Sequence, residues 1–330
     1  MIKFTIICDI IFNNKKYYLV QIFKLIWRYG LKTVILALNS KYIHSSLAPW
    51  YLKYACGNDC GQVKVLEYNI NDNIEWILTK IYAENPDIAA FSCYIWNIEF
   101  VFKIIGNLKK ILPDVKIVLG GPEVSYTPVK IMEDNPYIDF IICGEGEESF
   151  KKLLSVLDVE LGENYEKSNM KNSITSQLST LSVENIHGLC YRKEENILYD
   201  GRYCIIKDLD SIPSPYTDEM LSSLENNKIV YYEASRGCPF SCSYCISSTF
   251  EGVRYFSIDR VKDDLLKLIN AGVKQVKFVD RTFNCNKKRA KEIIRFVISN
   301  SMETNFHFEV AGDLFDDELI QLLSQAPEGL

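Results

Sequence analysis

Residues 235–245 read SRGCPFSCSYC and place three cysteines within eight residues. Cys238, Cys242 and Cys245 have the spacing C-x3-C-x2-C, and they follow KIVYYEAS (228–235), an apolar run typical of a buried strand. Thiolates that lie so close on one loop can converge on a single metal centre. The loop also begins at the carboxyl end of a strand, where β/α folds place their chemistry. The stretch therefore predicts a metal-binding loop at a strand end.

The number of ligands near this loop separates the kinds of metal centre. Four thiolates would complete a structural zinc site or saturate a [4Fe–4S] cluster, but no fourth cysteine lies near these three in sequence. Three thiolates on a four-iron cluster leave one iron open to an outside ligand. The alternatives are a zinc knuckle completed by Cys285 or His307 and a coincidence of three unrelated thiols.

The second half of the chain, residues 228–330, alternates between strand-like and helix-like runs. Each strand-like run is followed by a helix-like run, which is the order of a parallel β/α region. The predicted strands are 228–235, 274–280 and 305–312, and the predicted helices are 257–272, 287–301 and 316–326.

The first half, residues 31–159, repeats the same alternation five times. Continuous apolar strands separated by amphipathic helices indicate a parallel sheet that is covered on both faces. We therefore expect an α/β, doubly wound domain. Its predicted strands are 33–39, 63–70, 87–95, 116–121 and 138–144.

The remaining segments complete a predicted division into four parts. Residues 1–30 are an N-terminal extension, and residues 160–227 are a linker and hairpin between the 31–159 and 228–330 regions. The linker is polar and rich in Ser and Asn, and a hairpin is expected around Glu195 and Asn196.

Composition limits the classes of function. The chain has 330 residues, 48% of them hydrophobic, with a net charge of −6 and a pI near 5.4, so it lacks the basic footprint of a nucleic-acid-binding protein. No apolar run reaches the roughly 20 residues that span a bilayer. Eleven cysteines, an odd number, in a long chain without a signal-peptide pattern predict a cytoplasmic protein with reduced thiols.

The cysteine loop resembles a known family signature. RGCPFSCSYC is similar to the signature of the radical S-adenosylmethionine (radical SAM) superfamily, including the aromatic Tyr244 before the last cysteine. The resemblance implies a [4Fe–4S] cluster on Cys238, Cys242 and Cys245, with SAM on the open iron. It further implies one-electron cleavage of SAM to a 5′-deoxyadenosyl radical, with an electron donor such as flavodoxin or ferredoxin, while the protein positions the cofactors.

The same resemblance implies further SAM-binding positions. Asp280, Arg281 and Thr282 close the second strand of this half, where members of the superfamily carry a polar Gly-Gly-Glu motif at the methionine end of SAM. Tyr244 is expected near the adenine. Glu309 is expected to point into the barrel and to contact SAM or substrate.

The region 32–158 is similar to cobalamin-binding domains. Ser92 stands where that family has S-x-L, and Gly120 and Gly121 stand where it has Gly-Gly. Small residues at these strand ends leave room for the nucleotide tail of cobalamin beside the sheet. The resemblance therefore implies that Ser92, Gly120 and Gly121 bind cobalamin.

His44 occupies the histidine place of the family's D-x-H-x-x-G motif, in YIHSSL (42–47). A histidine there can ligate cobalt, and its second nitrogen normally bonds to a carboxylate that orients it. Here Tyr42 replaces the aspartate and Leu47 replaces the glycine. The resemblance implies cobalt ligation by His44, and the loss of the orienting aspartate weakens this expectation most.

The loop CGEGEESF (143–150) has two glycines and three glutamates before a predicted helix. The glutamates suit the positive end of a helix dipole, but they would repel phosphate. We therefore favour a structural role, or a wall of a cofactor pocket, over phosphate binding.

The two regions together resemble the B12-binding-domain subgroup of radical SAM enzymes, among uncharacterised bacterial members. Cores in this superfamily have more β/α units than residues 228–330 supply, so we expect a partial barrel in an N-terminal fragment of a longer protein. The implied reaction is methyl transfer or rearrangement on an unknown substrate. Methyl transfer would need cobalamin as the methyl carrier.

Two other functions stay open at this level. An RNA methylthiotransferase would carry cysteines for a second cluster in its first domain, where Cys56, Cys60, Cys93 and Cys143 are candidates that do not match convincingly. A non-catalytic zinc- or cluster-binding module is the other alternative.

Overall fold

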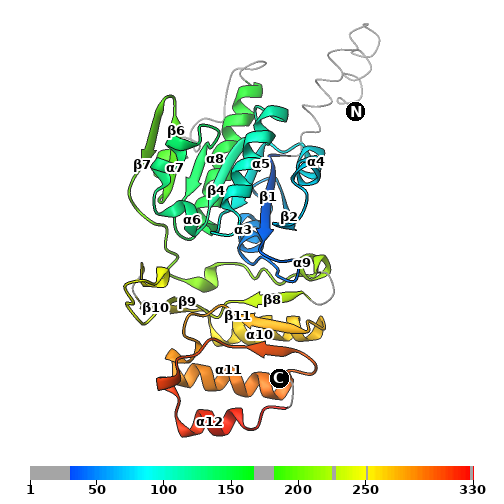
Figure 1. The fold of residues 1–330 in the computed structure, drawn as a ribbon, viewed down its shortest axis with the longest axis vertical. Helices are drawn as coiled ribbons and strands as arrows, with labels where there is room; N and C mark the ends of the chain where they lie inside the picture. Colours follow the sequence, from blue (N-terminus) through cyan, green and yellow to red (C-terminus); the bar gives the residue numbers. More distant parts are fainter. Residues whose placement is uncertain (1–29, 167–181, 225–227, 250–251, 328–329) are drawn as a thin grey trace, which may run out of the picture.

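The structure is a computed structural model, and it describes residues 30–166, 182–224, 228–249, 252–327 and 330. The predicted N-terminal extension lies outside the described residues except for Gly30, and so does the stretch 167–181 of the predicted linker. Two α/β parts are stacked along the long axis of the molecule, and the C-terminus lies beside α11 of the second, whose far end is formed by α12 (Figure 1).

The first part is built on a seven-stranded sheet with the order β2-β1-β3-β4-β5-β6-β7. The five strands β2, β1, β3, β4 and β5 are parallel, so the predicted doubly wound parallel sheet is confirmed. The strand order reverses direction between β1 and β3, and such switch points are where open α/β sheets bind ligands. The strands are β1 (Lys32–Asn39), β2 (Gln62–Asn69), β3 (Ile88–Ser92), β4 (Lys116–Gly120), β5 (Phe140–Ile142), β6 (Leu189–Lys193) and β7 (Asn196–Tyr199).

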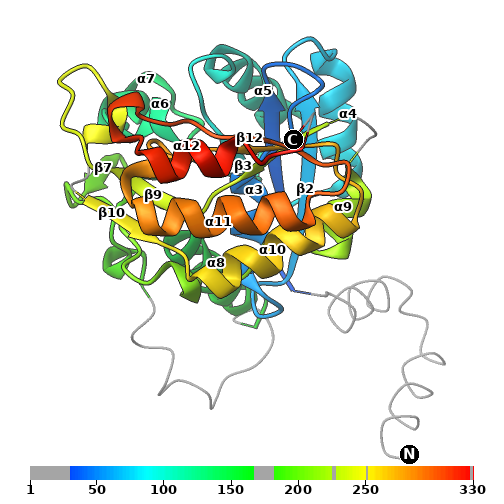
Figure 2. The same ribbon diagram turned by 90° about the horizontal axis from the view of Figure 1, so that it is seen from below.

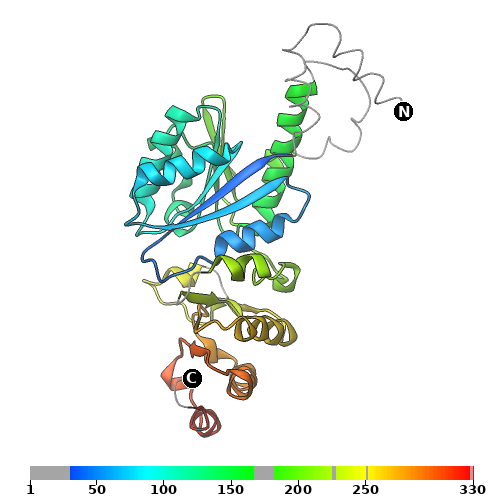
Figure 3. The same ribbon diagram turned by 90° about the vertical axis from the view of Figure 1, so that its right-hand side faces the viewer.

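Helices cover both faces of this sheet, as Figure 3 shows for the green α8 and the cyan α4 and α5. Ile35 packs toward α3 and α8, while its neighbours Leu36 and Leu38 pack toward α4 and α5. Each such burial stabilises the fold by about 1.5–3 kcal/mol, which is why β1 is apolar on both faces. One face carries α3 (Ala48–Cys56) and α8 (Glu147–Glu166); the other carries α4 (Ile74–Glu84), α5 (Ile98–Ile111), α6 (Pro122–Ser125) and α7 (Pro128–Asp134).

The predicted hairpin around Glu195 belongs to this sheet. Strands β6 and β7 are antiparallel, and β6 pairs with β5, with Tyr191 opposite Phe140. The pairing covers the edge of β5, whose backbone groups would otherwise lack partners. Part of the segment that we expected to be a linker therefore extends the first part.

The second part is a partial (β/α) barrel, as predicted. Its parallel three-stranded sheet has the order β12-β11-β8, and α10, α11 and α12 cover one face of it (Figure 2). Val276 and Phe278 are buried under these helices, and Lys277 between them lies on the opposite face. The elements are β8 (Ile229–Tyr232), β11 (Gln275–Phe278), β12 (Asn305–His307), α10 (Ile258–Asn270), α11 (Lys287–Asn300) and α12 (Asp317–Leu323).

A separate two-stranded hairpin, β9 (Ser235–Cys238) and β10 (Gly252–Tyr255), follows β8 and carries the cysteine loop. Gly237 has φ +100°, and a Cβ there would lie 2.1 Å from the backbone oxygen of Gly252. Only glycine fits, so Gly237 of the signature is what allows the two strands to approach.

Helix α3 joins the two parts. Trp50 and Tyr51 pack into the hydrophobic core of the second part, whereas Cys56 packs against the sheet of the first. The loop after β1 also pairs with β8, since Ile229 N donates to Ile43 O at 2.7 Å. Within the described ranges, no helix is both long and apolar enough to cross a bilayer.

Candidate cofactor site between the two parts

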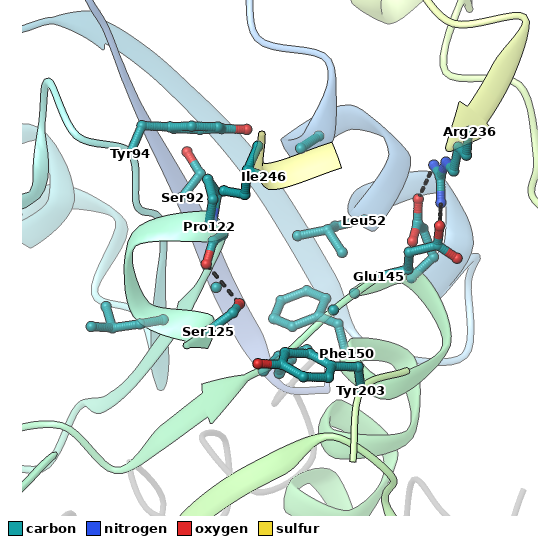
Figure 4. A pocket seen from close by; sticks show the side chains of 18 of the residues that line it. Leu52, Ser92, Tyr94, Pro122, Ser125, Glu145, Phe150, Tyr203, Arg236 and Ile246 are labelled. Carbon is teal, nitrogen blue, oxygen red and sulfur yellow. Dashed lines mark hydrogen bonds and ion pairs between the residues drawn. The ribbon is translucent and has the colours of Figure 1, made fainter. Parts of the chain in front are cut away.

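A cavity of about 440 Å³ lies at the junction of the two parts. It runs along the α3/α8 face of the first sheet, where its walls are apolar, and opens toward the cysteine hairpin. Figure 4 shows Leu52, Phe150 and Tyr203 on the side of the first part, and Arg236 and Ile246 on the side of the second. The cavity also borders β3 and β4 at their carboxyl ends, next to the switch point.

The predicted cobalamin-binding residues Ser92, Gly120 and Gly121 come together in the wall of this cavity. Gly121 has φ +109°, and a Cβ there would lie 2.5 Å from the backbone oxygen of Cys93. Ser125 donates its hydroxyl to Gly121 O at 2.7 Å and fixes the turn. The small side chains and apolar walls fit a planar, partly apolar tail, although the binding roles of these residues stay predictions.

His44 is not among the residues that line the cavity. Its Nδ1 lies 2.8 Å from the hydroxyl of Tyr231, and the two rings stack with centroids 5.8 Å apart. Burial, together with Lys41 and Lys277, lowers the pKa of His44. The tyrosine hydroxyl thus stands where the family has a carboxylate. The geometry gives no support to cobalt ligation by His44, which stays a prediction.

The three signature cysteines lie on the hairpin that borders the cavity, and none is in a disulfide. Cys238 ends β9, with its sulfur 3.7 Å from the hydroxyl of Thr282, and Cys242 is exposed. Cys245 N donates to Cys242 O at 3.0 Å, and the next residue, Ile246, lines the cavity. Three thiols on one loop beside a cavity fit a [4Fe–4S] cluster whose open iron takes a small-molecule ligand.

The zinc-knuckle alternative finds no support in the side chains that the structure describes. Among them, no three His, Cys, Asp or Glu are grouped to hold a single metal ion, and this includes the three signature cysteines, so the grouping itself does not separate zinc from a cluster. Cys285 instead lies 3.2 Å from the hydroxyl of Tyr255, and His307 is exposed at the end of β12.

The predicted SAM residues at the end of β11 have different surroundings. Asp280 is buried and accepts hydrogen bonds from Ala234 N at 2.9 Å and from the Ser235 hydroxyl. Burial raises the pKa of Asp280 to about 6. Arg281, by contrast, is exposed and lines the cavity. Asp280 therefore ties β11 to the start of the hairpin, while Arg281 is free to meet a ligand.

The other two predicted SAM contacts lie outside the cavity wall. Tyr244 is 91% exposed and points into solvent. Glu309 lies beyond the end of β12, 3.3 Å from Lys277 on the inner face of the strands, so its expected direction agrees with the alternation. Their contacts with SAM stay predictions.

A buried charge network that the sequence did not reveal crosses the junction. Arg236 of β9 contacts Glu147 at 2.5 Å, Glu233 at 2.9 Å and Glu145 at 3.7 Å. Arg254 of β10 holds both oxygens of Glu145, at 2.6 and 2.9 Å. Two of the three glutamates of the 143–150 loop, Glu145 and Glu147, are thus cavity-wall residues that pair with the hairpin. A cofactor-pocket wall was one of the roles that the sequence favoured for this loop, but nothing in the sequence pointed to the arginine partners.

Two carboxyl groups in this network have opposite pKa shifts. Burial raises the pKa of Glu233 to about 7, against the effect of Arg236. Burial also opposes the charged form of Glu145, but the hydrogen bonds from Arg254 and the charge of Arg236 lower its pKa overall. Glu145 therefore stays ionised and pairs with both arginines.

The cysteines proposed for a second cluster are on opposite faces of the first sheet. Cys56 and Cys60 are buried under α3 and α8, while Cys93 and Cys143 are buried under α4 and α5. The sheet separates the two pairs, so the four sulfurs cannot share one cluster. This placement removes the structural basis for the methylthiotransferase alternative.

Comparisons with known proteins match both parts of the chain. The B12 binding domain family matches residues 33–154, and the radical SAM superfamily matches residues 232–329. An uncharacterised methyltransferase of Pyrococcus horikoshii is 27% identical over 259 residues, which are 77% of this chain and 51% of that protein.

A second relative and a solved structure extend the comparison. The cobalamin-dependent radical SAM methyltransferase TokK of Streptomyces tokunonensis is 28% identical over 207 residues, 60% of this chain and 28% of its own length. The cobalamin-dependent S-adenosylmethionine radical enzyme OxsB has the same fold, with a TM-score of 0.68 at 18% identity, over 92% of this chain and 42% of that one. The chain spans about half the length of these proteins or less. It belongs to the B12-binding radical SAM proteins.

Proposed function

We propose that the chain carries the cofactor-binding parts of a cobalamin-dependent radical SAM enzyme that transfers a methyl group to an unreactive carbon. One observation carries the proposal: a single cavity is bordered by the Ser92, Gly120 and Gly121 wall on one side and by the cysteine hairpin on the other. The relatives named as methyltransferases support methyl transfer over rearrangement.

The donor groups fit this assignment. Cys238, Cys242 and Cys245 would hold the [4Fe–4S] cluster, and Ser92 with Gly121 would border cobalamin. When bound, the cluster and SAM supply a 5′-deoxyadenosyl radical, and cobalamin supplies a methyl carrier.

The chain's own residues bind and orient these groups. Arg281, exposed to the cavity at the end of β11, would pair with the carboxylate of SAM as an ordinary guanidinium–carboxylate contact. Asp280 holds the hairpin start in place from beneath, through Ala234 and Ser235. Leu52 and Phe150 make the inner wall of the cavity apolar.

The surroundings of the enzyme are part of the proposal. A one-electron donor such as flavodoxin or ferredoxin would reduce the cluster, and the substrate is unknown. Thiolate ligands need a reducing compartment, so we propose a cytoplasmic location.

Anaerobic reconstitution with iron, sulfide and hydroxocobalamin tests the proposal. We expect about four irons per chain with broad absorption near roughly 400 nm, one bound cobalamin, and SAM cleavage to 5′-deoxyadenosine under reduction. One zinc per chain without this absorption would refute the radical SAM assignment. A loaded cluster on a chain that binds no cobalamin would refute methyl transfer.

A further inference from the structure

The hairpin that carries the cluster cysteines has little support of its own. Strands β9 and β10 form a sheet of two strands that is not continuous with either larger sheet. An isolated two-stranded hairpin is only marginally stable in water. Its residues 239–242 and Tyr244 are exposed. Something outside the hairpin must therefore fix its position.

The two arginines of the hairpin lie directly opposite each other. Arg236 of β9 is the register partner of Arg254 of β10. Like charges directly opposite on neighbouring strands destabilise the pair. The hairpin therefore carries a built-in repulsion that anions must offset.

One anion, Glu233, lies just before the hairpin and pairs with Arg236 at 2.9 Å, whereas the anions that reach both arginines come from the first part of the molecule. Glu145 takes both nitrogens of Arg254 and lies 3.7 Å from Arg236, while Glu147 accepts from Arg236 at 2.5 Å. These side chains are mostly buried, with exposed fractions of 15% for Glu145, 8% for Glu147 and 11% for Arg236. Buried, fork-like contacts of this kind are strongly orienting.

The glutamates are themselves held firmly. Glu145 accepts from Ile206 N at 2.6 Å, and Glu147 begins α8, which packs along the first sheet. The network thus joins the end of β5 and the start of α8 to the strand that ends at Cys238. All four charged side chains line the cavity.

We propose that Glu145 and Glu147 are positioning residues for the cluster-binding hairpin: from the B12-binding part, they set the place of Cys238 relative to the cavity. The inference rests on the proposed function only in naming the cluster that the hairpin binds. The carboxylates act through Arg236 and Arg254.

Hydrogen–deuterium exchange on the cofactor-free full chain tests this positioning directly. We expect Glu147→Gln, and more strongly Glu145→Gln with Glu147→Gln, to speed exchange of peptides covering 235–238 and 252–256 by about tenfold or more, since breaking a buried ion pair is strongly destabilising. Peptides from β1 to β4 should keep their protection.

The matched control is Glu148→Gln. Glu148 lies in the same first turn of α8, is 53% exposed, and pairs only with Lys152 at 3.4 Å among the contacts of the described residues. The Glu148→Gln substitution removes the same charge from the same helix end, at a position that does not contact the hairpin. We expect no change in hairpin exchange. Equal effects of Glu147→Gln and Glu148→Gln, or no effect of either, would overturn the proposal.

A second measurement separates positioning from general stability. In the reconstituted protein, the electron paramagnetic resonance spectrum of the reduced cluster should respond to SAM in the wild type and in Glu148→Gln, and respond less or with altered g values in Glu147→Gln. Loss of protection throughout the chain, rather than in the hairpin, also overturns the proposal. Because exchange is read without cofactors, its outcome is independent of whether the chain binds cobalamin.

Discussion

The two walls of the cavity are built in different ways. Ser92, Gly120 and Gly121 lie at the ends of central strands in a seven-stranded sheet that is covered on both faces. The cysteines lie on a two-stranded hairpin that is held by ion pairs from the other part. Hydrophobic burial thus fixes one wall, and buried charge fixes the other. We expect the B12 wall to be preformed and the cluster wall to depend on its neighbours.

The largest effect should come from the cluster wall. We expect Cys242→Ala to abolish SAM cleavage and to lower the iron content well below the about four atoms per chain of the wild type. Iron analysis and 5′-deoxyadenosine production measure this. Cys285→Ala is the control, because Cys285 contacts Tyr255 instead of the cluster loop. Retained activity in Cys242→Ala, or iron loss in Cys285→Ala, would contradict the ligand set.

The B12 wall should respond through stability. Gly121→Ala places a Cβ 2.5 Å from Cys93 O at φ +109°, so we expect a loss of about 3 kcal/mol in unfolding free energy. Cobalamin affinity should fall with it. Gly272→Ala, at positive φ just after α10 but with nothing within 4 Å, should cost only about 1 kcal/mol. Urea denaturation compares the two variants, and equal costs would show that the close approach at Gly121 does not matter.

The link between β11 and the hairpin should depend on pH. Asp280 has a folded pKa of about 6, above its ordinary 3.8, so the native state holds its proton more tightly than the unfolded state does. Stability from this group is therefore lost as pH rises between these values. We expect the unfolding free energy of Asp280→Asn to rise by about 2–3 kcal/mol relative to that of the wild type as the pH increases from 4 to 7. A pH-independent difference would contradict the shifted pKa.

The smallest effect should be on SAM affinity. We expect Arg281→Ala to weaken SAM binding by about tenfold, the loss of one charge-assisted hydrogen bond, with stability unchanged because the side chain is exposed. Arg295→Ala is the control: Arg295 pairs with Glu318 on the outer helices. Equilibrium binding of SAM to the reconstituted protein measures both. The same affinity in the two variants would remove Arg281 from the site.

Local pattern was enough to predict most of the fold. Most apolar strands and amphipathic helices lie close to the predicted ranges, but the predicted strands 228–235 and 305–312 are too long: β8 ends at Tyr232 and β12 at His307. The signature predicted which loop carries the cysteines. The pairing of β6 with β5 and the separate β9–β10 hairpin were not predicted, because strand partners are chosen by the three-dimensional arrangement and not by local periodicity.

The site was harder to predict for the same reason. The contacts of Arg254 with Glu145 and of Tyr231 with His44 join residues 109 and 187 positions apart. Neither pair leaves a periodic signal in the sequence. Asp280 and Arg281 are adjacent in sequence, yet one is buried and the other is exposed. This difference is set by how the chain leaves the end of β11 and not by the two residue types.

The central claim is that one cavity brings both cofactors together. The most direct test is electron paramagnetic resonance of the anaerobically reconstituted chain with cob(II)alamin and the reduced cluster both present. We predict that the two signals broaden or split each other, as neighbouring spins do, and that each is normal when the other cofactor is left out. Two unperturbed signals, or a chain that takes up the cluster and no cobalamin, would contradict the account.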